Sequence, residues 1–197
     1  NNTPADPRRS RFFSTTGGNV VGVVQGSATA PVTISTFGPG LMQSQEQDGY
    51  VMLHAESLLL QAEAAERGFI AGNAQALFDE AILASCEMLG VAPATAATYV
   101  AEVNTVDGKG YAASTDKIEA IMFQKSIALC SINGLESWIE YTRTGYINNV
   151  PMPLGATSPT GAKPLRLMYP TSELASNSAN VPAVSVNQSF TTAPFWK

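Results

Sequence analysis

The sequence predicts a mainly α-helical protein with long irregular loops and little β structure. Between about residues 50 and 145, apolar residues recur at steps of three and four, which places them on one face of a helix. The flanking residues are rich in Gly, Ser, Thr and Pro and show no long periodic segment. With 197 residues, of which 45% are hydrophobic, the chain is long enough to bury a core. We therefore expect a helical core over 46–145, between irregular regions at 1–45 and 146–197.

The first region, residues 1–45, is predicted to be mostly irregular. Val20–Val24 and Pro31–Ile34 are candidates for short strands, but nearby glycines weaken them. Phe37–Gly40 is typical of a turn or loop, because it contains two glycines and a proline. From Phe12 to Gln45 no residue is charged, a run of 34. We expect packing to order this run, against the helices and, as a second surface, against an N-terminal half of the protein. The basic cluster Arg8-Arg9-Ser10-Arg11 is expected to be solvated.

Five helices are predicted from the periodicity and from residues that favour helix ends. Asn73 and Asp116 are good N-caps, because their side-chain oxygens accept hydrogen bonds from the first turn of the following helix. Glycine favours the other end, where the backbone often adopts a left-handed conformation. The predicted helices run over Tyr50–Arg67 before Gly68, Asn73–Leu89 before Gly90, Ala94–Val103, from Asp116 up to Gly134, and Leu135–Thr144 before Gly145.

The second predicted helix has the residue spacing of the second helix in a tetratricopeptide repeat. Ala74, Phe78, Ala81 and Ile82 carry this spacing. The small alanines allow a close approach of the first two helices, and Phe78 fills the groove between them. The short connection requires the two helices to pack antiparallel. One repeat does not make an array, and any tight helical hairpin produces the same spacing.

The charge of the chain argues against general binding of nucleic acid. The formal net charge is −5, and nucleic-acid binders need clustered Lys and Arg to displace counterions. Between Glu46 and Arg143 there are 14 acidic and 5 basic residues, so the acidic charge is concentrated in the predicted helices. No apolar run approaches the roughly 18 residues of a membrane span. The chain begins with Asn1 and not with Met, so we expect a mature or cut fragment.

No metal site or cofactor is expected. His54-Ala55-Glu56 matches the H-x-E of zinc deaminases, but that chemistry also needs a Pro-Cys-x-x-Cys pair, and Cys86 and Cys130 are far apart. We expect these two cysteines to be buried free thiols, with one bridge between helices as the alternative. The sequence also lacks a phosphate-binding loop and the nucleophile elbow of hydrolases.

No catalytic residue is expected either. Glycoside hydrolysis needs two opposed carboxylates. Glu136 and Glu140 are four residues apart on one predicted helix and share a face, and Glu56 and Glu63 share another helix but lie in no recognisable motif. Carboxylates four residues apart on a helix are usually solvated, and Arg143 is close enough to pair with Glu140. A hydrolase that uses Glu136 or Glu140 is therefore the least favoured function.

Short strings of residues, in order along the chain, resemble the C-terminal part of the SusD/RagB family. Each string is weak alone, but the ordered set is specific. The strings are Asp6-Pro7-Arg8, Phe12-Phe13, Val21-Gly22, His54-Ala55-Glu56, Ala62–Gly68, Ala74–Ser85, Gln124–Leu129, Gly134–Gly145, Arg166–Glu173 with Asn177 and Asn180, and Phe195-Trp196-Lys197. Ser126 and Thr142 replace the Trp and Arg that are usual in the family. Family members are more than twice as long, so the resemblance covers the C-terminal portion of one SusD-like domain.

The resemblance implies a non-catalytic lipoprotein on the cell surface of Bacteroidetes. Such a protein captures glycans or other nutrients at the outer membrane and works with a SusC-like, TonB-dependent transporter. The implied fold is α-helical, with tetratricopeptide-like helix pairs and long loops. The implied partners are a glycan or nutrient ligand, the transporter and the N-terminal half of the same protein, which would carry the lipid anchor.

The resemblance identifies no ligand residues, because the family builds its sites from variable loops. From loop position alone we predict that Phe37, Gln43 and Tyr111 contact the ligand. Rings stack on the C–H faces of sugars, and amides fix the orientation of the hydroxyl groups. Similar positions are held by Phe12, Phe13, Tyr50, Tyr146, Gln45 and Gln47, whereas Trp138 and Trp196 are expected to be structural. The alternative function is a tetratricopeptide-like scaffold that binds a protein or peptide.

Overall fold

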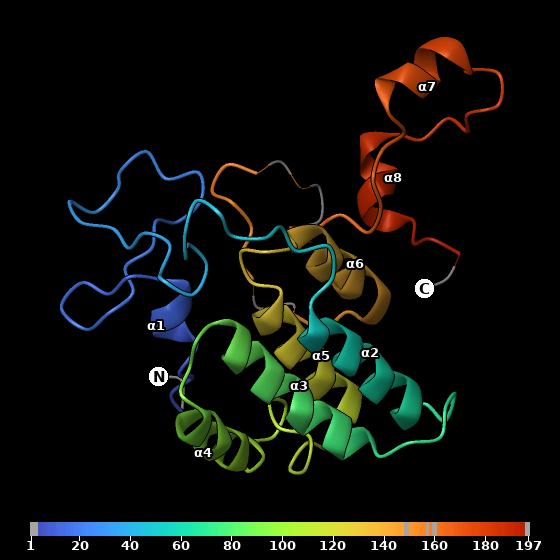
Figure 1. Cartoon of the computed structure of the whole chain (residues 1–197). Coiled ribbons are helices and arrows are strands. Elements are labelled where there is room, and N and C mark those ends of the chain that lie inside the picture. Colours follow the sequence, from blue (N-terminus) through green and yellow to red (C-terminus); the bar gives the residue numbers. More distant parts are fainter. Residues whose placement is uncertain (1–3, 148–149, 157, 159–160, 196–197) are drawn as a thin grey trace. The chain divides into compact units, whose positions relative to one another are not determined.

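Helices and loops make up the computed structural model, which describes residues 4–147, 150–156, 158 and 161–195 (Figure 1). Trp196, expected to be structural, lies outside the described residues. The helices of the described part are α1 (Arg9–Phe12), α2 (His54–Glu66), α3 (Ala74–Met88), α4 (Pro93–Val103), α5 (Lys117–Ala128), α6 (Gly134–Thr144), α7 (Thr171–Ser176) and α8 (Val186–Thr191). No strand forms within these residues, so the expected mainly α-helical class is confirmed.

The capping residues begin the helices as predicted. The Asn73 side chain accepts a hydrogen bond from the Ala76 N–H at 3.1 Å, at the start of α3. The Asp116 side chain accepts one from the Ile118 N–H at 2.9 Å, at the start of α5. Gly145 follows α6 with a φ of 81°, a left-handed conformation that glycine adopts without steric cost.

Two helix boundaries differ from the prediction. α2 begins at His54 and not at Tyr50, because Leu53 has an extended backbone that buries its side chain to 5% exposure. α5 ends at Ala128, well before Gly134, because the chain turns at Ser131 with a left-handed φ of 62°. Gly134 is the first residue of α6 and does not cap α5. The early end of α5 leaves Ser131 and Ile132 in a connecting turn.

The chain divides into two compact units, which are described separately. The first unit contains residues 1–23 and 30–138, and the second contains residues 24–29 and 139–197. In the first unit α2 packs against α3 and α5, and α3 also packs against α4 (Figure 1). The second unit contains α7 and α8, two one-to-two-turn helices that the sequence analysis did not predict. No helix in the described part of the chain has the length and apolarity that a membrane crossing requires.

The core of the first unit lies between α2, α3 and α5. The residues with the tetratricopeptide spacing are all buried: Ala74 at 8% exposure, Phe78 at 0%, and Ala81 and Ile82 at 1% each. Both cysteines are free, with Cys86 buried and Cys130 partly exposed. Burial raises the pKa of the Cys86 thiol to about 11, so this thiol stays protonated at neutral pH.

The long uncharged segment is ordered by the helices at its two ends. Phe12 is buried at 3% exposure, and Gly38 and Gly40 are buried as well. Between them most residues are exposed, and Val32 is exposed completely, so of the two expected packing surfaces the helices cover only the ends of the run. The two candidate strands, Val20–Val24 and Pro31–Ile34, do not form. Two isolated bridges, Phe13 with Phe37 and Thr16 with Asn19, are the β pairing found in the described residues.

Arg8 is the most buried charged side chain of the described residues, at 1% exposure, so the prediction of a solvated cluster was wrong for it. Its guanidinium donates to both carboxylate oxygens of Asp6, from Nε at 3.0 Å and from Nη2 at 2.7 Å. Nη2 also donates to Gln124 Oε1 on α5 at 2.7 Å, and Nη1 donates to Ser85 Oγ on α3 at 3.2 Å. The charge is buried because every part of it is paired.

α4 joins the same network through Tyr99. The Tyr99 hydroxyl donates to Asp6 Oδ2 at 3.0 Å, and the Arg8 guanidinium carbon lies 5.4 Å from the centre of the Tyr99 ring. Burial raises the pKa of Tyr99 to about 12, so its hydroxyl remains a donor. Burial alone would raise the pKa of Asp6, but the Arg8 guanidinium lowers it below its usual value of 3.8. One ion pair therefore connects the N-terminal segment to three helices.

The loop that follows α1 is fastened to α1 through main-chain atoms and to the end of α3 through the Arg11 side chain. Gly38 N–H donates to the Phe12 carbonyl at 2.7 Å, and Gly40 N–H donates to the Arg11 carbonyl at 2.9 Å. The Arg11 side chain in turn donates from Nε to the Leu89 carbonyl at 2.6 Å. A Cβ atom at Gly38 would lie 2.5 Å from the Arg11 carbonyl oxygen, so this approach requires glycine.

We expect Arg8→Met to lower the free energy of unfolding by about 3–5 kcal/mol, because it leaves Asp6 buried without its partner. Urea unfolding followed by circular dichroism measures the change. The neighbouring and exposed Arg9 gives the control, since Arg9→Met should change stability by less than about 0.5 kcal/mol. Equal losses in the two variants would show that the buried ion pair does not stabilise the fold.

The lowered pKa of Asp6 predicts a pH dependence with a definite sign. A carboxyl whose folded pKa is below its unfolded value stabilises the fold above the unfolded value, and loses this effect as pH falls through the folded value. Asp6→Asn should therefore be less stable than the parent at pH 7, and the gap should narrow as pH falls below about 4. Urea titrations at several pH values test this, and a gap that stays constant would contradict it.

We expect Gly38→Ala to lower the free energy of unfolding by about 1–3 kcal/mol, the usual effect of overpacking, because the new Cβ meets the Arg11 carbonyl. The matched control is Gly49→Ala in the same loop, where a Cβ would meet no atom within 4 Å. Urea unfolding of both variants measures the difference. If both are as stable as the parent, the loop is not held by this close approach.

Candidate functional site

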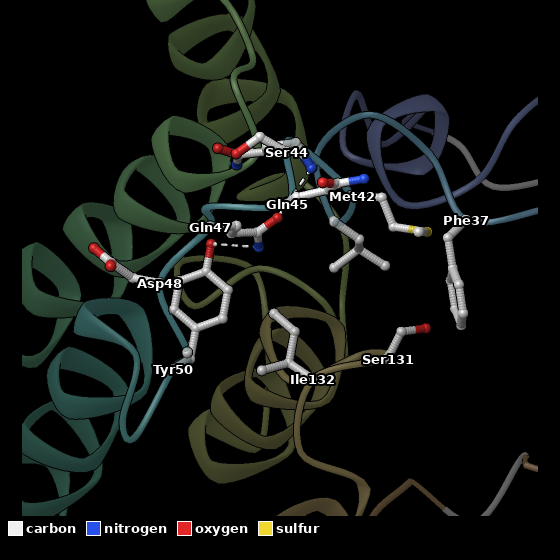
Figure 2. A pocket seen from close by; sticks show the side chains of 12 residues that line it. Phe37, Met42, Ser44, Gln45, Gln47, Asp48, Tyr50, Ser131 and Ile132 are labelled. Atoms are coloured by element: carbon white, nitrogen blue, oxygen red, sulfur yellow. Dashed lines mark hydrogen bonds between the residues drawn. The ribbon is translucent and has the colours of Figure 1, made fainter.

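A cavity of about 800 Å³ lies between the loop that precedes α2 and the turn that follows α5. Its volume falls within the range of small-molecule sites in proteins, about 300–1,000 Å³. Figure 2 shows the side chains that line it. They belong to Phe37, Leu41, Met42, Gln43, Ser44, Gln45, Gln47, Asp48, Gly49, Tyr50, Ser131 and Ile132.

The loop around the cavity is held by amide side chains. Gln43 Nε2 donates to the Gly40 carbonyl at 3.2 Å and to the Met88 carbonyl at 3.3 Å, which ties the loop to the end of α3. Gln47 Oε1 accepts from the Gln43 main-chain N–H at 2.9 Å, so the loop is closed by a bond between its own residues. The left-handed turn at Ser131 supplies a further part of the lining, between the two ends of the loop.

Two aromatic rings form exposed walls of the cavity. Phe37 is 54% exposed and Tyr50 is 41% exposed, although both are large apolar residues. Figure 2 shows them on opposite sides, with Ile132 and Ser131 between them. The Tyr50 hydroxyl accepts a hydrogen bond from Gln47 Nε2 at 3.4 Å, and its own hydrogen can be donated to a ligand. The cavity therefore offers ring faces together with amide and hydroxyl groups.

Two of the three predicted ligand residues, Phe37 and Gln43, line this cavity. Tyr50, Gln45 and Gln47, which hold similar loop positions in the sequence, line it as well. Ser131 and Ile132 had no signal in the sequence, because α5 was predicted to continue through them. Leu41, Met42, Ser44, Asp48 and Gly49 were also not predicted, and their position within the same loop was the available signal.

The structure places Tyr111 in a different environment. Its hydroxyl donates to the Glu66 carboxylate, its ring centroid lies 5.7 Å from that of Phe78, and Lys117 Nζ lies 5.0 Å from the ring centre. Desolvation, followed by the hydrogen bond to Glu66, raises the pKa of Tyr111 to about 12. Tyr111 is not among the residues lining the cavity.

The arrangement favours binding and not catalysis. Glu140 is 4% exposed and accepts a hydrogen bond from Arg143 Nε at 2.9 Å, as its spacing predicted. Neither Glu136 nor Glu140 lines the cavity. Among the described residues, no three His, Cys, Asp or Glu side chains are grouped so that they could hold a metal ion, and His54 is exposed at the start of α2.

A second and smaller cavity, of about 150 Å³, lies beside the Arg8 network. Asp6, Arg8, Phe12, Tyr99 and Phe123 are among the residues that line it. The polar groups of Asp6, Arg8 and Tyr99 already bond to one another, so they are satisfied without a ligand. The larger cavity is therefore the better candidate for a binding site.

The described fold and sequence match known proteins. The family model of SusD-like proteins, described as starch-binding and associating with the outer membrane, matches residues 2–170. A SusD homologue from Bacteroides fragilis is 26% identical, with a TM-score of 0.59, and the match covers 83% of this chain and 38% of that one. A chitin-binding protein is 32% identical, with a TM-score of 0.58, and the match covers 75% and 32% of the two chains.

A SusD-like protein from Bacteroidetes is 26% identical, with a TM-score of 0.55, and the match covers 74% of this chain and 29% of that one. The chain thus spans 29–38% of the length of these three structures. Comparison with curated protein sequences gives no match. The SusD-like family consists of non-catalytic binding proteins, in agreement with the expectation that the chain is not an enzyme. Since the family model matches most of the chain, from residue 2 to residue 170, the chain belongs to the SusD-like family of outer-membrane nutrient-binding proteins.

Proposed function

We propose that this chain captures an oligosaccharide in the cavity between Phe37 and Tyr50 and presents it to a SusC-like, TonB-dependent transporter of the outer membrane. The observation that carries the proposal is the pair of exposed rings on opposite sides of one cavity. Exposing such large apolar surfaces to water is unfavourable, and a sugar face that stacks on a ring removes this cost. The amides and hydroxyls between the rings would orient the sugar hydroxyls.

The amide groups of the cavity offer an uncommitted acceptor and donor to the ligand. Gln43 uses its NH₂ group to bind the Gly40 and Met88 carbonyls, and its Oε1 has no partner among the described residues. Gln45 makes no side-chain hydrogen bond to a described residue and is exposed, so its amide can both donate a hydrogen bond to a ligand and accept one from it. Sugar hydroxyls both donate and accept, and they fit this combination.

The relatives favour particular probes for the cavity. The family description names starch, and one similar structure is a chitin-binding protein. We therefore propose maltohexaose and chitohexaose as first ligands. Because the chain spans 29–38% of the solved relatives, we also propose that an N-terminal half and its lipid anchor act together with it at the cell surface.

The alternative function, a scaffold for a protein or peptide, is favoured by one observation. The α2–α3 hairpin exposes apolar side chains at its surface, namely Leu60 at 38%, Phe69 at 77%, Ile70 at 45% and Leu83 at 39%. Exposed apolar side chains that gather on one element are typical of contacts with other proteins. This surface is separate from the lining of the cavity, so variants can distinguish the two functions.

We expect Phe37→Ala and Tyr50→Ala each to weaken oligosaccharide binding by roughly 5- to 150-fold, if a sugar face gains about the same 1–3 kcal/mol that a nucleic-acid base gains by stacking on an aromatic ring. Isothermal titration calorimetry with maltohexaose and chitohexaose measures the affinity. Phe69→Ala is the matched control, because it removes an exposed ring outside the cavity.

Loss of sugar binding in Phe69→Ala but not in the cavity variants would contradict the proposed site. Absence of binding to any glycan, together with capture of a peptide that depends on Phe69, would favour the scaffold.

Tyr111→Ala tests the third predicted residue. Because its ring packs near Phe78 and its hydroxyl bonds to Glu66, we expect this variant to lose stability while its affinity stays within about twofold of the parent.

A further inference from the structure

The walls of the cavity are almost uncharged. Rings, a thioether, amides and hydroxyls line it, and Asp48 carries the one formal charge, which is negative, among the described lining residues. We propose that the cavity selects an uncharged oligosaccharide and rejects the acidic form of the same sugar chain, with Asp48 as a specificity-determining residue. This inference rests on the proposed function and adds to it the chemical class of the ligand.

The lining residues that the structure describes lack the groups that recognise acidic sugars. A carboxylate or sulfate that leaves water needs a cationic partner, and the planar fork of Arg meets this need best. The described lining residues offer neutral amides and hydroxyls in place of such a fork. Neutral sugar hydroxyls lose less hydration than a carboxylate or sulfate when they enter the cavity, and they find hydrogen-bond partners there. The cavity walls therefore favour a neutral sugar chain over its acidic form.

Two arginines of the segment that leads into the cavity loop, Arg8 and Arg11, are engaged in the fold. The Arg8 guanidinium pairs with the Asp6 carboxylate in the core, and Arg11 Nε donates to the Leu89 carbonyl at the end of α3. These contacts fasten the segment that carries the cavity loop. A move of either guanidinium to a bound anion would break them, and the loop itself would lose its attachment.

Asp48 adds electrostatic repulsion to this selection. Asp48 is exposed, and Figure 2 shows it beside Tyr50, one of the two rings proposed to stack on the sugar, with its carboxylate directed away from the centre of the cavity. A negative group on a stacked sugar would therefore meet a like charge at one end of the cavity. Helices α2 to α5 of the same unit carry eight of the 14 acidic residues between Glu46 and Arg143, and their charge opposes the approach of anions from solution as well.

A matched pair of ligands tests the inference. Oxidation of the C6 hydroxyl converts maltohexaose or chitohexaose into a polyanionic chain with the same backbone. In calorimetry at about 20 mM NaCl we expect the oxidised form to bind at least about tenfold more weakly than the neutral form. The difference should shrink at about 500 mM NaCl, where charges on the surface are screened.

Variants assign the repulsion to one residue. Asp48→Asn should strengthen binding of the oxidised form by about two- to fivefold, the effect of one exposed charge pair. Glu80→Gln removes an equally exposed carboxylate on α3 outside the lining, and should leave the ratio of the two affinities unchanged. An oxidised ligand that binds as tightly as the neutral one would overturn the inference, as would equal effects of the two variants. The proposed function would survive both outcomes if Phe37→Ala and Tyr50→Ala still weaken binding, whereas absence of binding to every form would overturn both proposals.

Discussion

The ion pair between Asp6 and Arg8 is the contact on which the helical unit depends. It lies at a point where an N-terminal segment, which has little regular structure of its own, meets α3, α4 and α5. A guanidinium supplies five N–H donors in fixed directions, so it can hold several segments at once. A lysine has the charge but not this geometry, and an apolar residue has neither. The segment that begins with this pair continues through Arg11 to the cavity loop, so the position of the proposed site follows from a contact in the core.

The helices could be predicted from the sequence, because the information that forms them is local. Asn73 and Asp116 begin α3 and α5, and a period of three and four residues marks the buried faces. The burial of Arg8 could not be predicted in this way, because its partners Ser85 and Gln124 lie 77 and 116 residues away in sequence. The short helix α8 begins with a capping box formed by Ser185 and Gln188, which is a local signal of a helix start.

The cavity could be predicted only in part, for a related reason. Phe37 and Gln43 were chosen because they lie in a loop, and the loop folds so that both contribute to one wall. Tyr111 met the same criterion, but a neighbouring carboxylate, Glu66, binds its hydroxyl elsewhere. Loop position identifies residues that are exposed enough to bind a ligand, but it does not show which of them converge. Convergence depends on where α5 ends, and that end is set by a left-handed residue, Ser131, whose side chain does not predict this conformation.

The attachment of the cavity loop through main-chain atoms has a consequence for how such sites can change over evolution. The carbonyl groups of Met88 and Leu89 are present whatever side chains stand at those positions, and the bonds of Gly38 and Gly40 are likewise made by the backbone. Among the side chains that line the cavity, those of Gln43 and Gln47 also hold the loop. Substitutions at Phe37, Gln45, Asp48 or Tyr50 can alter cargo preference while the loop keeps its path. Preservation of the loop thus depends on a few amides and on main-chain atoms, and ligand choice can diversify at the other lining residues.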